Sequence, residues 1–488
     1  MNKFLKLLGF DESKETTVKT EIVAGIVTFL AMAYILTVNP NQIVGSGSPY
    51  WSSVFIATAL GAVIGTLLMA FLAKMPLAQA SGMGLNSMLG GIIGGWGGYG
   101  AALTPGQGFM LVLLSGFVFL LLSAVSIKGK TVRELVFDGM PVSIRSSISV
   151  GIGLFIAFIG FQNAKVIVDD PYVLLKLADF STFNVNTANA FVCLIGLFII
   201  AILDKLNVKG SIIIGVLCAT IIGIPLGVTD LGILAGSGDV SWKFWDNFAN
   251  FFAGENSVFL SFTDVFTEGF APEGMSLFTV LMILMTLCMI DMFDTMGTIV
   301  GCCGGNRVLS DENDKPHNYG KIMLADALAT CGGAMLGTST VTTFVESGAG
   351  VSAGGRTGLT AFSSACMFFL SMFALPVFAA IPSAAAASAL VYVGVLMMKH
   401  NAKSIDFSNT INATSAFLTI SVMVLSYSIT KGIGIGILSY TLMSVMSYLF
   451  ELVKYAITKE NKPEFEVSVV AIVVSLLFCI YFFVPAVI

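Results

Sequence analysis

The amino-acid sequence predicts an all-α membrane protein that crosses the bilayer many times. Of its 488 residues, 56% are hydrophobic and only 11% are charged, and the mean hydropathy is +0.91. A soluble domain of this length needs a much more polar surface. Apolar runs of about 20 residues, the length that crosses a bilayer, recur along the chain. The clearest cover residues 22 to 40, 52 to 73, 108 to 127, 211 to 228, 276 to 300 and 359 to 381.

An acidic segment, residues 229–275, divides the chain into two halves of similar content. It holds seven acidic residues and one lysine, so we interpret it as an extracellular or periplasmic linker loop. We expect seven apolar segments before it, within 1–228, and seven or eight after it, within 276–488. An odd number of spans inserts the two halves in opposite directions, which predicts inverted repeats.

The connections between the expected spans alternate between rich and poor in lysine and arginine. Cytoplasmic loops are the enriched ones, so the pattern predicts a cytoplasmic N-terminus and a multi-pass location in the inner (plasma) membrane. The basic residues assigned to cytoplasmic loops are Lys128, Lys130, Arg133, Lys205, Lys209, Arg307, Lys315, Lys321, Lys399 and Lys403.

Composition and spacing also exclude several classes of function. A net charge of −5 provides no basic surface for a nucleic acid. The eight cysteines lack the spacing of a zinc site, so we expect no metal and no cofactor. Neither a Ser/His/Asp arrangement nor an HExxH motif is present, and we expect that the protein is not an enzyme.

A glycine-rich phrase, Ser-Gly-x-Gly-apolar-polar, occurs at residues 81–86 and again at 347–352, in the third apolar segment of each half. Both segments are short and broken by glycine. Irregular backbone is tolerated in a membrane only where protein buries it or it lines a cavity, and paired broken segments indicate a transporter's binding site. Close helix packing through small residues is the alternative. The substrate-site residues predicted from the phrases are Gly82, Met83, Gly84, Ser347 and Gly348.

Several carboxylates lie in apolar surroundings. A charge at the bilayer centre costs roughly 2.5 to 3.5 kcal/mol, which makes each a functional candidate. The nearest cations in sequence, Lys321 and Arg356, are too few to pair with all of them. The alternative, a structural carboxylate that caps a broken helix, is favoured for one residue, Asp326. The four carboxylates are Asp291, Asp294, Asp326 and Glu346.

Asp291, Asp294 and Thr295 are spaced so that a helix would present all three toward one face. Burial and a neighbouring carboxylate both disfavour ionisation. We therefore expect one of the two aspartates to carry a proton, as in a proton-coupled carrier. Asp294 and Asp291 are the proton-coupling candidates, and Asp291 and Thr295 are also candidates for substrate binding.

Aligning the two phrases places Glu346 opposite Ala80 and Asn86 opposite Ser352. A carboxylate accepts two parallel N–H bonds, while an amide both donates and accepts. Such a mixture suits a neutral heterocycle and suits an oxyanion poorly. An anion exchanger of the same architecture, a channel and a membrane enzyme remain as alternatives.

Five stretches of the chain resemble the nucleobase:cation symporters of the xanthine/uracil permease superfamily, in its AzgA-like branch. The resemblance spans nearly the whole chain. It rests on residues 28–40 (TFLAMAYILTVNP), 81–86 (SGMGLN), 151–164 (GIGLFIAFIGFQNA), 291–298 (DMFDTMGT) and 337–361 (GTSTVTTFVESGAGVSAGGRTGLTA).

The resemblance implies a uracil-permease-like fold of about 14 transmembrane helices in two inverted repeats of seven. Short strands in segments 3 and 10 would meet at the substrate. A core domain would move against a gate domain, and gate domains would pair in a homodimer. The core covers approximately 20–127 plus 276–381, and the gate approximately 145–228 plus 383–488.

The resemblance also implies import of hypoxanthine, guanine and adenine. Asp291 matches an acid that contacts the base, Glu346 one that binds ring N–H groups, and Asn86 an amide that shapes affinity. Asp294 matches an essential acid, for which we hypothesise coupling to a co-transported proton. Ser81 stands where the branch usually has proline, and residues 87–91 lack its aromatic side chains. Another base, such as xanthine or uracil, therefore remains an alternative.

Overall fold

The structure is a computed structural model that describes most of the chain. The described residues are 3–11, 16–93, 103–127, 130–133, 135, 139–172, 174–235, 240–269, 277–303, 306, 308–310, 316–459, 465 and 467–483.

The described residues of the first half form helices, five short strands and the connections between them. Its first span is broken into two helices at residues 33–34. The elements are α1 (Lys3–Leu7), α2 (Val18–Met32), α3 (Ile35–Ile43), α4 (Trp51–Leu68), η2 (Met69–Ala73), β1 (Gln79–Ser81), α5 (Met83–Ile93), α6 (Pro105–Ala124), β2 (Ser126–Ile127), β3 (Lys130–Thr131), α8 (Val142–Asn163), β4 (Ile167–Asp170), β5 (Leu174–Leu177), α9 (Val185–Lys205) and α10 (Ser211–Gly223).

Among its described residues, the second half begins with a short 3₁₀ helix and two α-helices and continues with further helices and one short strand. It comprises η3 (Leu231–Ala235), α11 (Phe244–Ala253), α12 (Val258–Glu268), α13 (Leu277–Cys303), α14 (Tyr319–Leu336), β6 (Val341–Thr343), α15 (Ser347–Ser352), α16 (Gly358–Ser371), η4 (Met372–Ala374), α17 (Leu375–Ala379), α18 (Ser383–Asn401), η5 (Ala402–Ser404), α19 (Thr410–Leu425), α20 (Ile429–Thr458) and α21 (Val469–Phe483).

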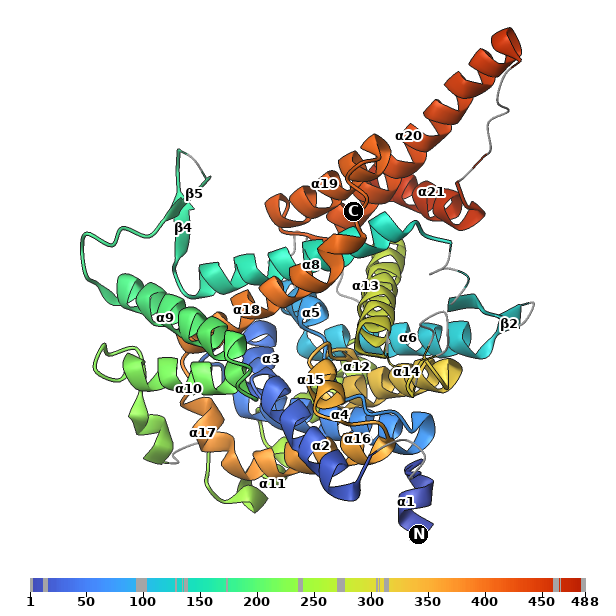
Figure 1. Ribbon diagram of the computed structural model, residues 1–488. Helices are drawn as coiled ribbons and strands as arrows, with labels where there is room; N and C mark the ends of the chain where they lie inside the picture. The colour runs from blue at the N-terminus through green and yellow to red at the C-terminus, as the bar shows by residue number, and fades with distance from the viewer. Residues whose placement is uncertain are drawn as a thin grey trace.

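The helical, many-span fold predicted from the apolar runs is confirmed. Within the described residues, nine helical stretches are long and apolar enough to cross a bilayer, and four shorter apolar helices accompany them. Each expected segment of both halves coincides with a helix or a strand–helix unit. The eighth apolar segment after the linker is α21, which packs against α20. The end of α20 projects from the body of the molecule (Figure 1).

The two third segments meet as the short strands expected from the family resemblance. β1 pairs with β6 in antiparallel register, with Gln79 opposite Thr343 and Ser81 opposite Val341. The alignment of the two phrases is wrong in register, however. Residues 81–86 run from the end of a strand into a helix, whereas 347–352 form α15 alone. Glycine and serine fit strand ends and helix starts equally well, so a match between such residues does not define a register.

The helices pack in two groups. In one, α14 packs against α4 and α6, and α16 packs against α2 and α4, around the paired strands. In the other, α18 packs against α8 and α9, and α19 packs against α8 and α20. Figure 1 shows α8 and α18 beside each other, above α3 and α15. The groups meet where α13 and α5 contact α8, and where α18 contacts α3.

Within its described residues, the expected linker loop contains two α-helices besides the short η3. α11 packs against α4, and α12 packs against α4, α6 and α14. Their phenylalanines, such as Phe251 and Phe259, cluster on one another, with ring centroids 5.9 Å apart. The acidic residues concealed this amphipathic pattern, in which one apolar helix face packs on the bundle. Residues 236–239 and 270–276 of this region lie outside the described residues.

Two glycines allow α8 and α18 to approach closely. A Cβ built on Gly394 would lie 2.4 Å from the carbonyl oxygen of Gly153, and one built on Gly153 would lie 2.7 Å from Cβ of Met397. Helices in membranes commonly associate through small residues of this kind.

Gly394→Ala is therefore expected to destabilise the protein by about 1 to 3 kcal/mol, because the backbones of two helices must move apart. The loss would be measured as a lower melting temperature in detergent. Gly332→Ala on α14 is the matched control, since its nearest neighbour would be Ile64 Cγ2 at 3.5 Å. Equal melting temperatures for the two variants would contradict this account of the α8–α18 contact.

Candidate functional site

A small cavity lies where the two helix groups meet, beside the paired strands. Its volume is about 30 Å³, enough for about two water molecules and far below the roughly 300 Å³ of a small-molecule site. We call it the central cavity. It is lined by Met83, Gly84, Ile152, Ile156, Asp294, Thr298, Thr343, Phe344, Val345, Glu346, Val393, Leu396 and Met397.

The central cavity combines carboxylates from one helix group with apolar walls from the other. Asp294 reaches it from the middle of α13, and Glu346 from the turn between β6 and α15. Glu346 is only 8% exposed. The opposite wall consists of aliphatic side chains of α8 and α18, such as Ile152 and Val393. A flat ring could lie against this wall while its edge meets the carboxylates.

Tyr34 holds Glu346 in place. It lies at the break between α2 and α3, and its hydroxyl donates to Glu346 Oε1 at 2.6 Å. The same hydroxyl is 3.7 Å from Met83 Sδ. Our sequence analysis did not identify Tyr34 as a site residue, although it lies in the stretch 28–40 that supports the family resemblance. No helical periodicity indicated that its side chain would point toward a residue 312 positions away.

The residues predicted from the two phrases have different positions. Met83 and Gly84 line the central cavity. Gly82 donates its N–H to the Thr340 carbonyl at 2.9 Å, and a Cβ there would lie 3.0 Å from Thr342 Oγ1. Ser347 accepts at 3.0 Å from the backbone N–H of Ala78. These two residues therefore join the broken segments to each other.

Asn86 lies in the first turn of α5, which follows β1. The part of the chain that the structure describes places it outside the lining of the central cavity, fully buried. Its side-chain oxygen accepts a hydrogen bond from Ser339, and its nitrogen donates to the Ser81 carbonyl at 3.4 Å. Ser81 in turn bonds to Thr338 at 2.6 Å. Asn86 thus supports the strand that carries the site.

Asp291 and Thr295 point toward α14. Thr330 donates to Asp291 Oδ2 at 3.4 Å, and Thr295 donates to Asp326 Oδ1 at 2.9 Å. The prediction that Asp291, Asp294 and Thr295 share one face is therefore wrong for Asp294, which lines the central cavity instead. A spacing of three residues leaves two side chains about 60° apart around a helix, enough for them to meet different neighbours.

A buried ion pair stands beside these residues. Arg133 Nη2 lies 2.8 Å from Asp326 Oδ2, and neither side chain is exposed. Gln79 also donates to Asp326, at 3.1 Å, and the Arg133 guanidinium lies 4.4 Å from the Phe119 ring centroid. Arg133 belongs to the connection between α6 and α8, but its side chain is fully buried. A count of basic residues does not report that one of these side chains folds back into the helix bundle.

Glu21 is a further buried carboxylate, which the sequence analysis missed because it lies near the start of the first apolar run. It accepts from the backbone N–H groups of Arg356 at 2.9 Å and Thr360 at 3.2 Å, and from the Thr360 hydroxyl at 2.5 Å. Glu21 therefore stabilises the beginning of α16, and these hydrogen bonds link α16 to α2.

The described residues also line two larger cavities, which we call the inner and outer vestibules after the orientation that we propose below. The inner vestibule, about 770 Å³, is lined among others by Asp204, Lys209, Gly348, Arg356 and Lys399, and it shares Glu346 with the central cavity.

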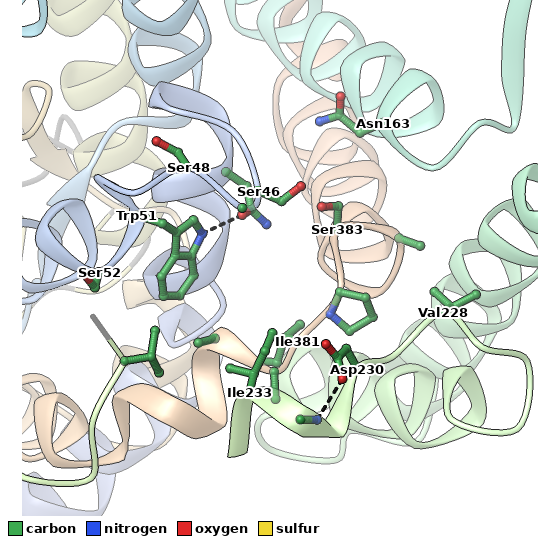
Figure 2. A pocket seen from close by; sticks show the side chains of 18 of the residues that line it. Ser46, Ser48, Trp51, Ser52, Asn163, Val228, Asp230, Ile233, Ile381 and Ser383 are labelled. Carbon is green, nitrogen blue, oxygen red and sulfur yellow. Dashed lines mark hydrogen bonds between the residues drawn. The ribbon is translucent and has the colours of Figure 1, made fainter. Parts of the chain in front are cut away.

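The outer vestibule has a volume of about 690 Å³. It is lined by residues at the start of α18, whereas residues at the end of the same helix line the inner vestibule. Figure 2 shows Ser46, Ser48 and Trp51 facing Asn163 and Ser383 across it, with Asp230 on a third side. The Trp51 indole N–H donates to Asn41 at 2.7 Å.

Comparison with known proteins agrees with this architecture. The transmembrane domain of a cyanobacterial bicarbonate transporter, BicA, superposes with a TM-score of 0.58 at 14% identity, covering 85% of this chain and 97% of that domain. This likeness confirms the expected fold, and it concerns the fold alone.

The sequence relatives are permeases rather than enzymes. The guanine/hypoxanthine permease PbuO of Bacillus subtilis (strain 168) is 34% identical over 435 residues, 88% of this chain and 93% of that protein. The adenine permease AdeP of Escherichia coli (strain K12) is 33% identical over 430 residues, 88% of each chain. A family model described as Permease family, that of the xanthine and uracil permeases, matches residues 19–435. The chain belongs to this family, in the branch of the adenine and guanine/hypoxanthine permeases.

Proposed function

We propose that this protein imports the purine nucleobases hypoxanthine, guanine and adenine by proton symport. The observation that carries the proposal is the placement of Asp294 and Glu346 in one cavity between two helix groups. Purine permeases are among the relatives, and the acidic lining suits the N–H edge of a neutral base better than an oxyanion.

In this proposal Glu346 accepts hydrogen bonds from the ring N–H groups of the base. Tyr34 occupies Oε1 from the side of α3, which leaves Oε2 for the substrate. The aliphatic side chains of Ile156 and Val393 pack against the ring face. Gly84 lets the base lie close to the backbone of α5. A Cβ at this position would project into the cavity, 3.0 Å from Cγ2 of Ile152.

Transport requires the central cavity to open, because about 30 Å³ is too small for a purine. The apolar wall belongs to α8 and α18, and the acidic wall to α13 and the β6–α15 turn. We propose that the first group is the gate domain and the second the core, within the boundaries expected from the sequence, as two inverted repeats. Their relative movement would connect the site first with the outer vestibule and then with the inner one, as alternating access requires.

Asp294 is the proposed proton carrier. It lies in the cavity with the buried Glu346, and two neighbouring carboxylates do not both ionise readily. Asp291 is the second candidate, because one of its oxygens is buried and has no hydrogen-bond partner among the described residues.

Asp294→Asn is expected to retain base binding but lose accumulation driven by a proton gradient. One coupled proton and one pH unit support up to about tenfold accumulation, since a pH unit corresponds to about 1.4 kcal/mol. The variant should only equilibrate the base across the membrane of proteoliposomes. Asp246→Asn, an exposed carboxylate of α11, is the matched control. Undiminished gradient-driven accumulation by Asp294→Asn would remove Asp294 from this role.

The decisive test of the function is uptake of radiolabelled compounds into proteoliposomes with an acidic exterior. We expect hypoxanthine, guanine or adenine to accumulate unaltered and bicarbonate not to be carried. Accumulation of xanthine or uracil alone would assign another nucleobase. Exchange of bicarbonate without base uptake would support an anion exchanger and refute the proposal.

Orientation and assembly are further parts of the proposal. The lysine and arginine bias supports a cytoplasmic N-terminus in the plasma membrane, which places the inner vestibule, with Lys209, Arg356 and Lys399, at the cytoplasmic side. We also propose a homodimer through the gate domains. The exposed apolar side chains of α9 and α19, such as Phe198 at 58% and Phe417 at 65%, would face lipid or a second copy.

A further inference from the structure

The inner vestibule carries polar groups that recognition of a base does not use. Its volume of about 770 Å³ lies within the range of about 300 to 1,000 Å³ of small-molecule sites. One end is formed by Glu346, the proposed base-binding residue, and the exposed end by Lys209 and Lys399. A ligand that fills the vestibule would therefore extend beyond a base toward positive charge.

The start of α10 forms part of the exposed end. Lys209, Gly210 and Ser211 line the vestibule, and Gly210 precedes the helix with a φ of +76°. In the described part of the chain, no side chain caps this helix start, so its first N–H groups are available to an anion. Ser211 is only 7% exposed, and its hydroxyl makes no hydrogen bond to any described residue.

Arg356 lies in the same cavity and is held in position. Its Nη1 donates to the carbonyls of Val351 at 2.6 Å and Gly355 at 2.7 Å, and its backbone N–H donates to Glu21. A fixed guanidinium loses little side-chain entropy when it binds an anion. Lysines at cytoplasmic helix ends are expected from topology alone. Topology does not predict a fixed arginine and an uncapped helix start in the cavity that contains Glu346.

The balance of charge favours an anion at the exposed end. Among the described lining residues, Lys209, Arg356 and Lys399 oppose Asp204 and Glu346. Glu346 is the buried member of this set, at 8% exposure, and it hydrogen-bonds to Tyr34. Apart from the buried Glu346, three cations and one carboxylate therefore line the vestibule.

We propose that the inner vestibule binds purine nucleoside monophosphates, with the base at Glu346 and the phosphate at the α10 start with Lys209, Arg356 and Lys399. The base placement rests on the proposed function. A nucleoside monophosphate would compete with the transported base from this side of the membrane. The carrier would thus be inhibited by the class of compound formed when an imported base acquires a ribose phosphate.

The test measures how well competing compounds displace radiolabelled guanine bound to the purified full-length protein in detergent. GMP should displace the base at a concentration about tenfold lower than guanosine, because only GMP supplies the charge-assisted contacts. Inorganic phosphate alone should not displace it. Equal potency of GMP and guanosine, or displacement by phosphate as efficient as by GMP, would overturn the inference. Hypoxanthine with IMP and inosine, or adenine with AMP and adenosine, replaces this set if guanine does not bind. If none of the three bases binds, the proposed function fails, and this inference fails with it.

Variants of the lysines connect any preference for the nucleotide to this cavity. Lys209→Gln and Lys399→Gln should each reduce the tenfold ratio between guanosine and GMP to about threefold. Lys403→Gln is the matched control, because Lys403 is exposed one turn beyond Lys399 and does not line the vestibule in the described structure. A ratio that both Lys209→Gln and Lys399→Gln leave unchanged would refute the assignment. The ratio compares two ligands on one variant, so differences in protein stability do not affect it.

Discussion

Replacing Glu346 by glutamine is expected to weaken purine binding by at least about 100-fold. The change leaves an acceptor for the Tyr34 hydroxyl but places an NH₂ group where the base would present its own N–H. Losing hydrogen bonds to a charged acceptor and setting one donor against another costs about 3 kcal/mol, which corresponds to that factor. Equilibrium binding of radiolabelled base in detergent measures the loss directly.

Two comparisons make the Glu346 result specific. Glu451→Gln makes the same chemical change on the exposed surface of α20 and should bind the base like the unaltered protein. The melting temperature of Glu346→Gln should remain within a few degrees of that of the unaltered chain, because the variant fills the same volume. Base binding within about threefold of normal, in a folded Glu346→Gln variant, would remove Glu346 from the substrate site.

Replacing Arg133 by leucine is expected to have the largest effect on stability. The change leaves Asp326 as an unpaired charge in the interior, since both partners of this ion pair are fully buried. Removing one partner of such a pair costs about 3 to 5 kcal/mol. We expect a large fall in melting temperature and in the yield of folded protein, measured by fluorescence-detected size exclusion after heating.

A double variant distinguishes loss of the pair from loss of packing. Arg133→Leu with Asp326→Asn removes both charges but retains an acceptor for Thr295, and it should recover most of the stability. Lys321→Gln removes an exposed cation from the same helix, α14, and should have little effect. If the single Arg133→Leu variant were as stable as the double variant, the ion pair would have no stabilising role.

The architecture was largely predictable from the sequence. Apolar length alone located the spans, because each crossing must bury its backbone hydrogen bonds in lipid for about 20 residues. The paired glycine-broken segments indicated where the helices would be interrupted, and β1 and β6 lie there. The same reasoning identified Asp294 and Glu346 as candidates, because an acidic side chain within an apolar run is costly to place in a membrane and is usually functional.

The sequence by itself therefore determined that this chain is a polytopic permease with acids at its centre, and which segments carry them. Only the tertiary structure decided which acids share a cavity: Asp294 faces it with Glu346, Asp291 turns toward α14, and Arg133 returns from a connection to pair with Asp326. It also decided that Tyr34 holds Glu346. Partition into lipid depends on the composition of each segment taken alone and can be read locally. The partner of a buried polar side chain depends on the register and rotation of helices that are distant in the chain.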